Sequence, residues 1–168
     1  MLDVRTIEKK GHGSLISISR LRPDTPEIAI CARWRIDAFS EVLGTSHEKE
    51  VARLNAFASV PKGEAGFVAY WGETPAGTCL LARKEIEPCH PLSPWLAGLF
   101  VATEFRKRGV AEALIRAIEN EAQAQGHDFI YLYADEEEAF YAKRGWTVVE
   151  RFEWLGAPTT LMSKALAA

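Results

Sequence analysis

Apolar and polar residues alternate in SLISISRL (14–21), WTVVERFEW (146–154) and TTLMSKAL (159–166). A period of two is typical of strands with one buried face. GFVAYW (66–71) and AGTCLLARKEI (76–86) are also predicted strands. The turn residues GETPAG lie between them, so these two strands are expected to form an antiparallel hairpin.

Two other stretches are almost entirely apolar. WLAGLFV (95–101) has the composition of a strand that is buried on both faces, and FIYLYA (129–134) is a second apolar strand.

Helical spacing begins after the first strand. Apolar residues recur every three or four positions from Ile28 to Leu43, as they do along one face of a helix. Thr25 is a suitable N-cap for this helix, Pro26 suits its first turn, and Gly44 can close it.

Three further helices are predicted. Thr45 and Glu48 form a capping-box pattern that starts the first of them. The second runs from the region of residue 110 to about residue 125, and EEEAFYAKRG (136–145) forms the short third one. The buried face of the helix ending near residue 125 is predicted to hold Leu114, Ile118 and Ala122.

The predicted order of elements is β-α-α-β-β-β-α-β-α-β-β. An antiparallel hairpin in front and a β-α-β crossover in the middle indicate an α/β (α+β) fold, with a mixed sheet and helices on its faces. A chain of 168 residues usually forms one domain, which we assign to residues 14–168. Residues 1–13 are polar and contain glycine, and we expect a flexible extension there.

Charge and composition exclude several classes of protein. The net charge of −3 disfavours a general nucleic-acid binder. The three cysteines and four histidines have neither the spacing of a disulfide framework nor that of a metal site. No stretch is apolar enough to span a membrane, and the N-terminus has no signal-peptide pattern. We therefore expect a cytoplasmic protein that uses no metal and has no membrane partner.

The stretch EFRKRGVAEAL (104–114) places three cations directly before a predicted helix. Positive side chains at a helix N-terminus oppose the helix dipole, so a negative ligand would compensate them. Gly109 permits a tight turn and close approach to the backbone, and the N–H groups of the first helical turn have no partner within the helix. A pyrophosphate would match this anion site.

This loop resembles the acyl-CoA pyrophosphate loop of the GNAT superfamily of N-acetyltransferases, Arg/Gln-x-x-Gly-x-Gly/Ala, here Arg106-x-x-Gly109-x-Ala111. The stretch AFYAKRGW (139–146) resembles a second signature of that family, a Phe-Tyr-x-Lys-x-Gly helix followed by an aromatic residue. The two motifs stand in the family's order, with the expected helix and strand between them. The resemblance extends over about residues 15–166.

The resemblance implies a largely antiparallel mixed sheet in which a central parallel strand pair splays apart. It also implies acetyl-CoA as co-substrate, with its pantetheine arm in the splay and its pyrophosphate on the backbone amides of the loop. The cofactor-binding residues that it implies are Leu99, Phe100, Val101, Arg106, Lys107, Arg108, Gly109, Val110, Ala111 and Glu112.

Two catalytic groups follow from the same resemblance. The Tyr141 hydroxyl would protonate the departing thiolate, and a backbone N–H near Leu99 would polarise the thioester carbonyl. The amine would attack directly in a ternary complex. Alternatively, Tyr141 only packs beside Phe140.

The base is left open, because the strand 95–101 lacks the carboxylate that many family members carry there. Glu104 lies close to the phosphate loop. Asp135 is either an N-cap, which we favour, or the base. A base that acts through water, or an amine that needs no base, is a further option. The Glu136–Glu138 run either forms a negatively charged helix start or attracts a cationic amine. Three aromatic residues are core or acceptor-pocket residues, namely Trp34, Phe39 and Trp95.

The pattern and the resemblance together predict an N-acetyltransferase that acts on a primary amine of a small molecule or a protein. Many relatives form homodimers, so a homodimer is a further expectation. The alternative is a CoA-binding or sensing module that keeps the fold without catalysis, which the missing strand carboxylate would explain. The loops and the first two helices set the acceptor, and they carry no transferable motif.

Overall fold

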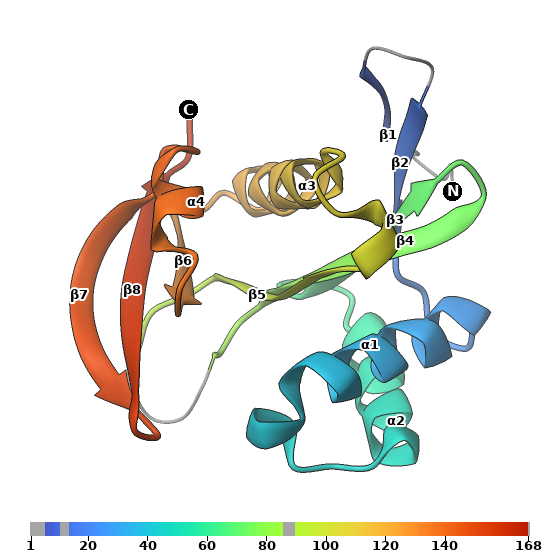
Figure 1. Ribbon diagram of the computed structural model, residues 1–168, viewed down its shortest axis with the longest axis horizontal. Helices are drawn as coiled ribbons and strands as arrows, with labels where there is room; N and C mark the ends of the chain where they lie inside the picture. Colours follow the sequence, from blue (N-terminus) through green and yellow to red (C-terminus); the bar gives the residue numbers. More distant parts are fainter. Residues whose placement is uncertain (1–5, 11–13, 86–89, 168) are drawn as a thin grey trace.

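The computed structural model describes residues 6–10, 14–85 and 90–167. In this part of the chain, one eight-stranded sheet has the order β1-β2-β3-β4-β5-β6-β8-β7 (Figure 1). Among the strands of the described ranges, only β5 and β6 are parallel neighbours, so the predicted mixed, largely antiparallel sheet is confirmed. The strands are β1 (Thr6–Lys10), β2 (Ser14–Arg20), β3 (Ala65–Trp71), β4 (Thr74–Ala82), β5 (Trp95–Val101), β6 (Phe129–Ala134), β7 (Thr147–Trp154) and β8 (Ala157–Ala165).

Helices cover both faces of the sheet. In Figure 1, α1 and α2 lie below the sheet, and α3 lies above it. Helix α3 packs on β3, β4 and β5, and its predicted buried face is confirmed, because all three predicted side chains are fully buried. The helices are α1 (Pro26–Leu43), α2 (His47–Ala58), α3 (Val110–Ala124) and α4 (Glu138–Ala142), with a 3-10 turn η1 (Thr103–Phe105) before α3.

Strand β1 lies within the stretch that we expected to be a flexible extension. Its residues pair antiparallel with β2, from Thr6 opposite Ile18 to Lys10 opposite Ser14. The sequence TIEKK has too few apolar residues for periodicity to identify it as a strand. Backbone hydrogen bonds to β2 define this strand, and those bonds do not depend on side-chain type.

The core has two parts, one on each face of the sheet, and β6 contributes to both. Ile130 and Leu132 pack into the cluster beneath α3. Tyr131 and Tyr133 point to the opposite face, where they border the cluster around Trp95. The alternation of side chains along a strand produces this division.

Helix α2 begins one residue later than the sequence predicts. Ser46 is its N-cap, and the Ser46 Oγ accepts a hydrogen bond of 3.2 Å from the Lys49 N–H. The predicted capping box at Thr45 is therefore wrong. At α1, Thr25 occupies the N-cap position, but its hydroxyl donates to the Arg22 carbonyl over 2.8 Å.

Strands β5 and β6 pair at only one position. Trp95 faces Tyr131, and the Tyr131 N–H donates to the Pro94 carbonyl over 3.1 Å. Beyond this point the strands diverge, which confirms the predicted splay of the central parallel pair. The expectation that the whole of 95–101 is buried holds only for its first three residues, because residues 98–101 border the opening.

A bulge in β5 lies at the start of this opening. The pairing of β4 with β5 shifts register between Thr78 and Leu80, so that Gly98 and Leu99 together stand opposite Cys79. A bulge leaves one residue outside the regular ladder and bends the strand. Gly98 has a φ of +60°, a conformation that glycine adopts without strain.

Arg35 of α1 occupies the space next to this bulge. A Cβ built on Gly98 would collide with the Nη1 atom of Arg35. The Nε of Arg35 donates to Glu50 of α2 over 2.7 Å, and the Glu50 side chain is only 1% exposed. The buried ion pair therefore connects α1 and α2 directly beneath the bulge.

We predict that Ser46→Ala lowers the free energy of unfolding by about 1 kcal/mol, because the N–H of Lys49 loses its cap. Thr45→Ala should lower the free energy of unfolding by only a few tenths of a kcal/mol. Chemical denaturation of the two variants measures the difference. Equal losses, or a larger loss at Thr45, would contradict the assigned cap.

A second prediction concerns Gly98→Ala, with Gly72→Ala as its matched control. Both glycines have nearly the same positive φ, 60° and 62°, but nothing lies within 4 Å of a Cβ at Gly72. The backbone strain of alanine is therefore similar at both positions. Gly98→Ala should lower the free energy of unfolding by about 1 kcal/mol more, because the new methyl overpacks against the Arg35 guanidinium, whose Nε is held by Glu50. Equal losses in chemical denaturation would rule out the close contact with Arg35.

Candidate functional site

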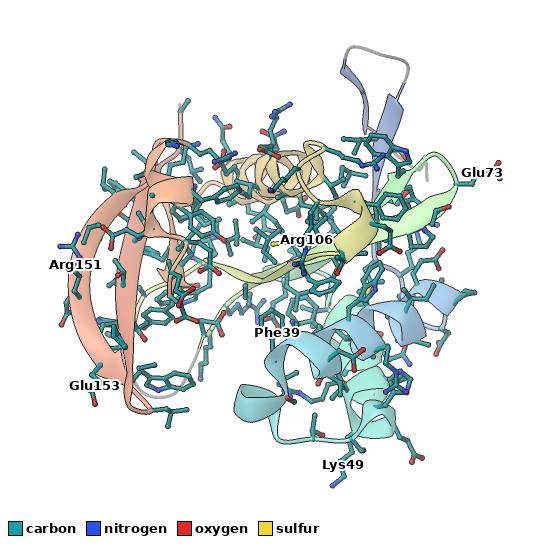
Figure 2. The ribbon with its side chains drawn as sticks, in the orientation of Figure 1. Phe39, Lys49, Glu73, Arg106, Arg151 and Glu153 are labelled. Carbon is teal, nitrogen blue, oxygen red and sulfur yellow. The ribbon has the colours of Figure 1, made fainter. Side chains whose placement is uncertain are left out.

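A cleft of about 640 Å³ lies where β5 and β6 diverge. Its walls come from the second half of β5, the loop before α3, the first turn of α3, and α4. Figure 2 shows Arg106 above β5 and Phe39 of α1 below it. Ten of the eleven cofactor-binding and catalytic residues that the resemblance implies line this cleft, namely Leu99, Phe100, Val101, Arg106, Lys107, Gly109, Val110, Ala111, Glu112 and Tyr141.

The loop between β5 and α3 bends sharply before the helix. Lys107 and Gly109 both have a positive φ, 60° and 90°, which is uncommon for a lysine. Gly109 is the N-cap of α3 and supplies no side-chain hydrogen bond to it. The N–H groups of the first turn of α3 therefore lie at the cleft without a side-chain cap, in the arrangement that binds anions.

The three cations of the loop point in different directions. The Nε of Arg106 donates to the Val101 carbonyl at the end of β5 over 3.0 Å. Lys107 lines the cleft. The guanidinium of Arg108 lies 5.2 Å from the ring centre of Trp71, and Arg108 is not among the residues that line the cleft. Two of the three predicted cations thus belong to the cleft wall.

Tyr141 closes the opposite side of the cleft. Its side chain is 8% exposed and packs edge-on against Phe140 and Trp146, with ring centres 5.2 and 6.0 Å apart. Burial raises the pKa of the Tyr141 hydroxyl above its ordinary value. The hydroxyl is therefore protonated at neutral pH and can donate a proton.

An ion pair that the sequence did not reveal joins the two sides of the cleft. The Nη2 of Arg144 lies 2.5 Å from a carboxylate oxygen of Glu112 in the first turn of α3. The Nη1 of Arg144 donates to the Phe140 carbonyl over 2.7 Å, and its guanidinium covers the Phe140 ring at 3.6 Å. These contacts fix the segment that carries Tyr141 relative to the loop. The partners are 32 residues apart, so no local pattern predicts them.

A second cavity of about 190 Å³ lies on the α1 side of the bulge. It shares residues with the first cleft, among them Gly98 and Tyr133, so the two spaces meet at the bulge. Helix α1 is kinked at Phe39, where φ is −126° and ψ is 25°. The residues that line this cavity are Arg35, Phe39, Leu43, Glu85, Ala97, Gly98, Tyr133, Asp135, Trp154 and Thr159.

Of the three aromatic residues considered for an acceptor pocket, only Phe39 lines a cavity. Trp34 packs on Phe100, with ring centres 5.5 Å apart. Trp95 is fully buried and stacks on Tyr133 at 4.6 Å, which makes it a core residue.

Carboxylates do occur around the junction of the two cavities. Asp135 lines both cavities, and the N-cap of α4 is Glu137, so the favoured interpretation of Asp135 as an N-cap is wrong. Glu85 also lines both cavities and was missed, because the sequence suggested only a strand end there. Glu104 lies in η1 and is not among the lining residues of either cavity. Glu138 is paired with Arg151.

His90 has a more defined environment than a surface loop residue. One ring nitrogen lies 2.6 Å from the Tyr133 hydroxyl, and the other lies 2.7 Å from a Glu150 carboxylate oxygen.

Across the described residues, no three His, Cys, Asp or Glu side chains are grouped as metal ligands. Within the same ranges, no helix has the length and apolar content needed to cross a membrane.

Solved structures with this fold include several acetyltransferases. An aminoglycoside 6'-N-acetyltransferase complexed with coenzyme A superimposes with a TM-score of 0.73 at 15% identity, covering 90% of this chain and 97% of that one. The aminoglycoside 6'-N-acetyltransferase from Enterococcus faecium gives 0.68 at 17% identity, with 90% and 97% covered. A GNAT-family acetyltransferase from Streptococcus pneumoniae gives 0.69 at 15% identity, with 90% and 99% covered. At these identities the likeness concerns the fold alone.

No curated protein sequence shows significant similarity to the chain. The family model described as "Acetyltransferase (GNAT) family" matches residues 28–146, which include both the loop motif and the Tyr141 motif. This match covers well over half of the chain, and it agrees with the splayed strand pair and the cleft beside it. The chain belongs to the GNAT acetyltransferase family.

Proposed function

We propose that this protein transfers an acetyl group from acetyl-CoA to a primary amine, by direct attack in a ternary complex. The observation that carries the proposal is the cleft between β5 and β6, which brings together an uncapped helix N-terminus and a buried, protonated tyrosine. A structure of the same fold that is complexed with coenzyme A supports the choice of acyl donor.

The cleft walls offer two kinds of contact to acetyl-CoA. The backbone of Leu99, Phe100 and Val101 borders the opening, where β6 does not pair with it, and it can hydrogen-bond an extended pantetheine arm. The amides from Lys107 to Glu112, together with Arg106, would hold the pyrophosphate.

The chemistry follows from the groups around the bulge. The neutral amine attacks the thioester carbonyl, and the Leu99 N–H stabilises the negative charge that develops on its oxygen. The position of Leu99 in the bulge, outside the regular ladder, supports this role. When the C–S bond breaks, the Tyr141 hydroxyl gives its proton to the thiolate, which leaves as CoA thiol.

The amine must lose a proton before or during the attack. Asp135 and Glu85 line the junction of the two cavities and are the carboxylates best placed to accept it, directly or through water. Their presence weakens the case for a binding module without catalysis, because that alternative rested on a missing carboxylate in the strand. We place the reaction in the cytoplasm, as the sequence suggested.

Two measurements test the proposed function. Isothermal titration with acetyl-CoA should give binding at micromolar concentrations, and release of CoA thiol should follow when amines are added. Absence of binding would overturn the proposal. Binding without thiol release across a broad amine panel would favour the sensing module instead.

Gly109→Val should abolish acetyl-CoA binding in the same titration. A branched side chain opposes the φ of +90° and blocks approach of a phosphate to the helix N-terminus. Gly126→Val is the matched control, because Gly126 follows the other end of α3 and has a similar φ of +86°. The control should lose stability but keep its affinity. Equal affinity in the two variants would mean that the loop does not hold the pyrophosphate.

Tyr141→Phe should lower kcat by about 10²–10⁴-fold, the usual contribution of a general acid. Acetyl-CoA affinity and Tm should change little, because phenylalanine keeps the ring contacts with Phe140 and Trp146. Steady-state kinetics with a well-used acceptor measures the effect. An unchanged kcat would remove Tyr141 from the mechanism and leave solvent as the proton donor.

A further inference from the structure

Arg35 is a cation held almost out of solvent at the junction of the two cavities. Its side chain is 11% exposed, and its Nε donates to Glu50 over 2.7 Å. Glu50 is itself buried and also accepts from Arg53 over 3.3 Å. One edge of the Arg35 guanidinium is therefore fixed by a carboxylate that cannot move away without losing two partners.

The other edge of the same guanidinium faces the reaction site. Nη1 lies against Gly98, and Arg35 is part of the wall of the smaller cavity. In the portion of the chain that the structure covers, Glu50 is the hydrogen-bond partner of Arg35, and it engages only Nε. The Nη groups of an arginine that borders a cavity can bind a further acceptor, and a carboxylate fits their planar fork.

The remaining walls of this cavity carry negative charge, opposite to that of Arg35, and apolar side chains. Asp135 and Glu85 contribute carboxylates that attract an ammonium group. Phe39, Leu43 and Trp154 contribute apolar side chains. A cation, two anions and an apolar wall around about 190 Å³ match a small zwitterion with an apolar substituent.

We propose that the acceptor is an α-amino acid with an apolar side chain, and that Arg35 binds its carboxylate. This inference rests on the proposed function, since it names the acceptor of that reaction. In an α-amino acid, the amine and the carboxylate are attached to one carbon. A carboxylate on the Nη groups beside Gly98 therefore holds the amine next to Leu99, the residue proposed to stabilise the thioester oxygen. The apolar side chain then lies against Phe39 and Trp154.

Matched acceptor pairs test this proposal on the unaltered protein. Each amino acid is compared with its decarboxylated amine in an assay of thiol release from acetyl-CoA: leucine with isopentylamine, phenylalanine with phenethylamine, and tryptophan with tryptamine. At least one amino acid should have a kcat/KM about 10- to 100-fold higher than its amine, as expected for a charge-assisted bidentate contact. Amines that react as well as every amino acid would overturn the proposal.

Arg35→Gln and Arg35→Lys then assign the preference to a residue. Both variants should raise the KM for the amino acid and reduce the preference over its amine, Gln more than Lys, while turnover of the amine persists. Arg53→Gln is the control, because Arg53 binds the same Glu50 but is 60% exposed and is not a lining residue of the cavity. It should leave the preference unchanged. If the Arg35 variants lose activity toward amino acid and amine in the same proportion, Arg35 only supports the fold.

The outcomes separate this proposal from the broader one. If simple amines, polyamines or aminoglycosides are acetylated and amino acids are not, the acceptor assignment is wrong and the acetyltransferase function stands. If acetyl-CoA does not bind at all, both fail. The matched pairs need only the unaltered protein, so a variant that does not fold leaves this decision intact.

Discussion

The divergence of β5 and β6 is the constraint on which the rest of the structure depends. Two neighbouring parallel strands normally hydrogen-bond along their length, but here they pair only where Trp95 faces Tyr131. The second half of β5 therefore has backbone groups that the sheet does not satisfy on the β6 side. Such groups need a partner, and an extended ligand chain can supply one. The cleft is thus a consequence of strand pairing.

Different helices border the diverging strands on the two faces of the sheet. Above the sheet, α3 directs its N-terminus at the opening, and the Arg144–Glu112 ion pair fixes α4 beside it. Below the sheet, α1 brings Arg35 against the bulge at Gly98, and buried Glu50 holds it there. The proposed donor and acceptor sites therefore meet at a single bulged residue pair, Gly98 and Leu99.

The two motifs that resemble the family signatures each lie in one short stretch of the chain, and the structure brings them to one cleft. Arg106, Gly109 and Ala111 line one wall and Tyr141 the opposite wall, while their roles toward acetyl-CoA stay predictions. The order of strands and helices predicted the mixed sheet because each segment has a clear period. Strand β1 was missed, since its backbone pairing leaves no hydrophobic pattern.

Contacts between distant segments could not be predicted in the same way. Arg35 and Glu50 belong to two different helices, and nothing in either sequence specifies that they meet beneath Gly98. The sequence does not distinguish Arg108 from its neighbours, but the turn at Lys107 and Gly109 directs it onto Trp71. The sequence predicts a helix cap at Asp135, but α4 starts three residues later. In each case, side-chain direction in three dimensions decided the role.

A crystal structure of the protein with bound CoA tests the central claim most directly. The account predicts the pantetheine arm between β5 and β6, hydrogen-bonded to the backbone of residues 99–101. It also predicts the pyrophosphate at the N-terminus of α3 and the sulfur within hydrogen-bonding reach of the Tyr141 hydroxyl. CoA bound elsewhere, or a β5–β6 opening that closes into continuous strand pairing, would contradict it.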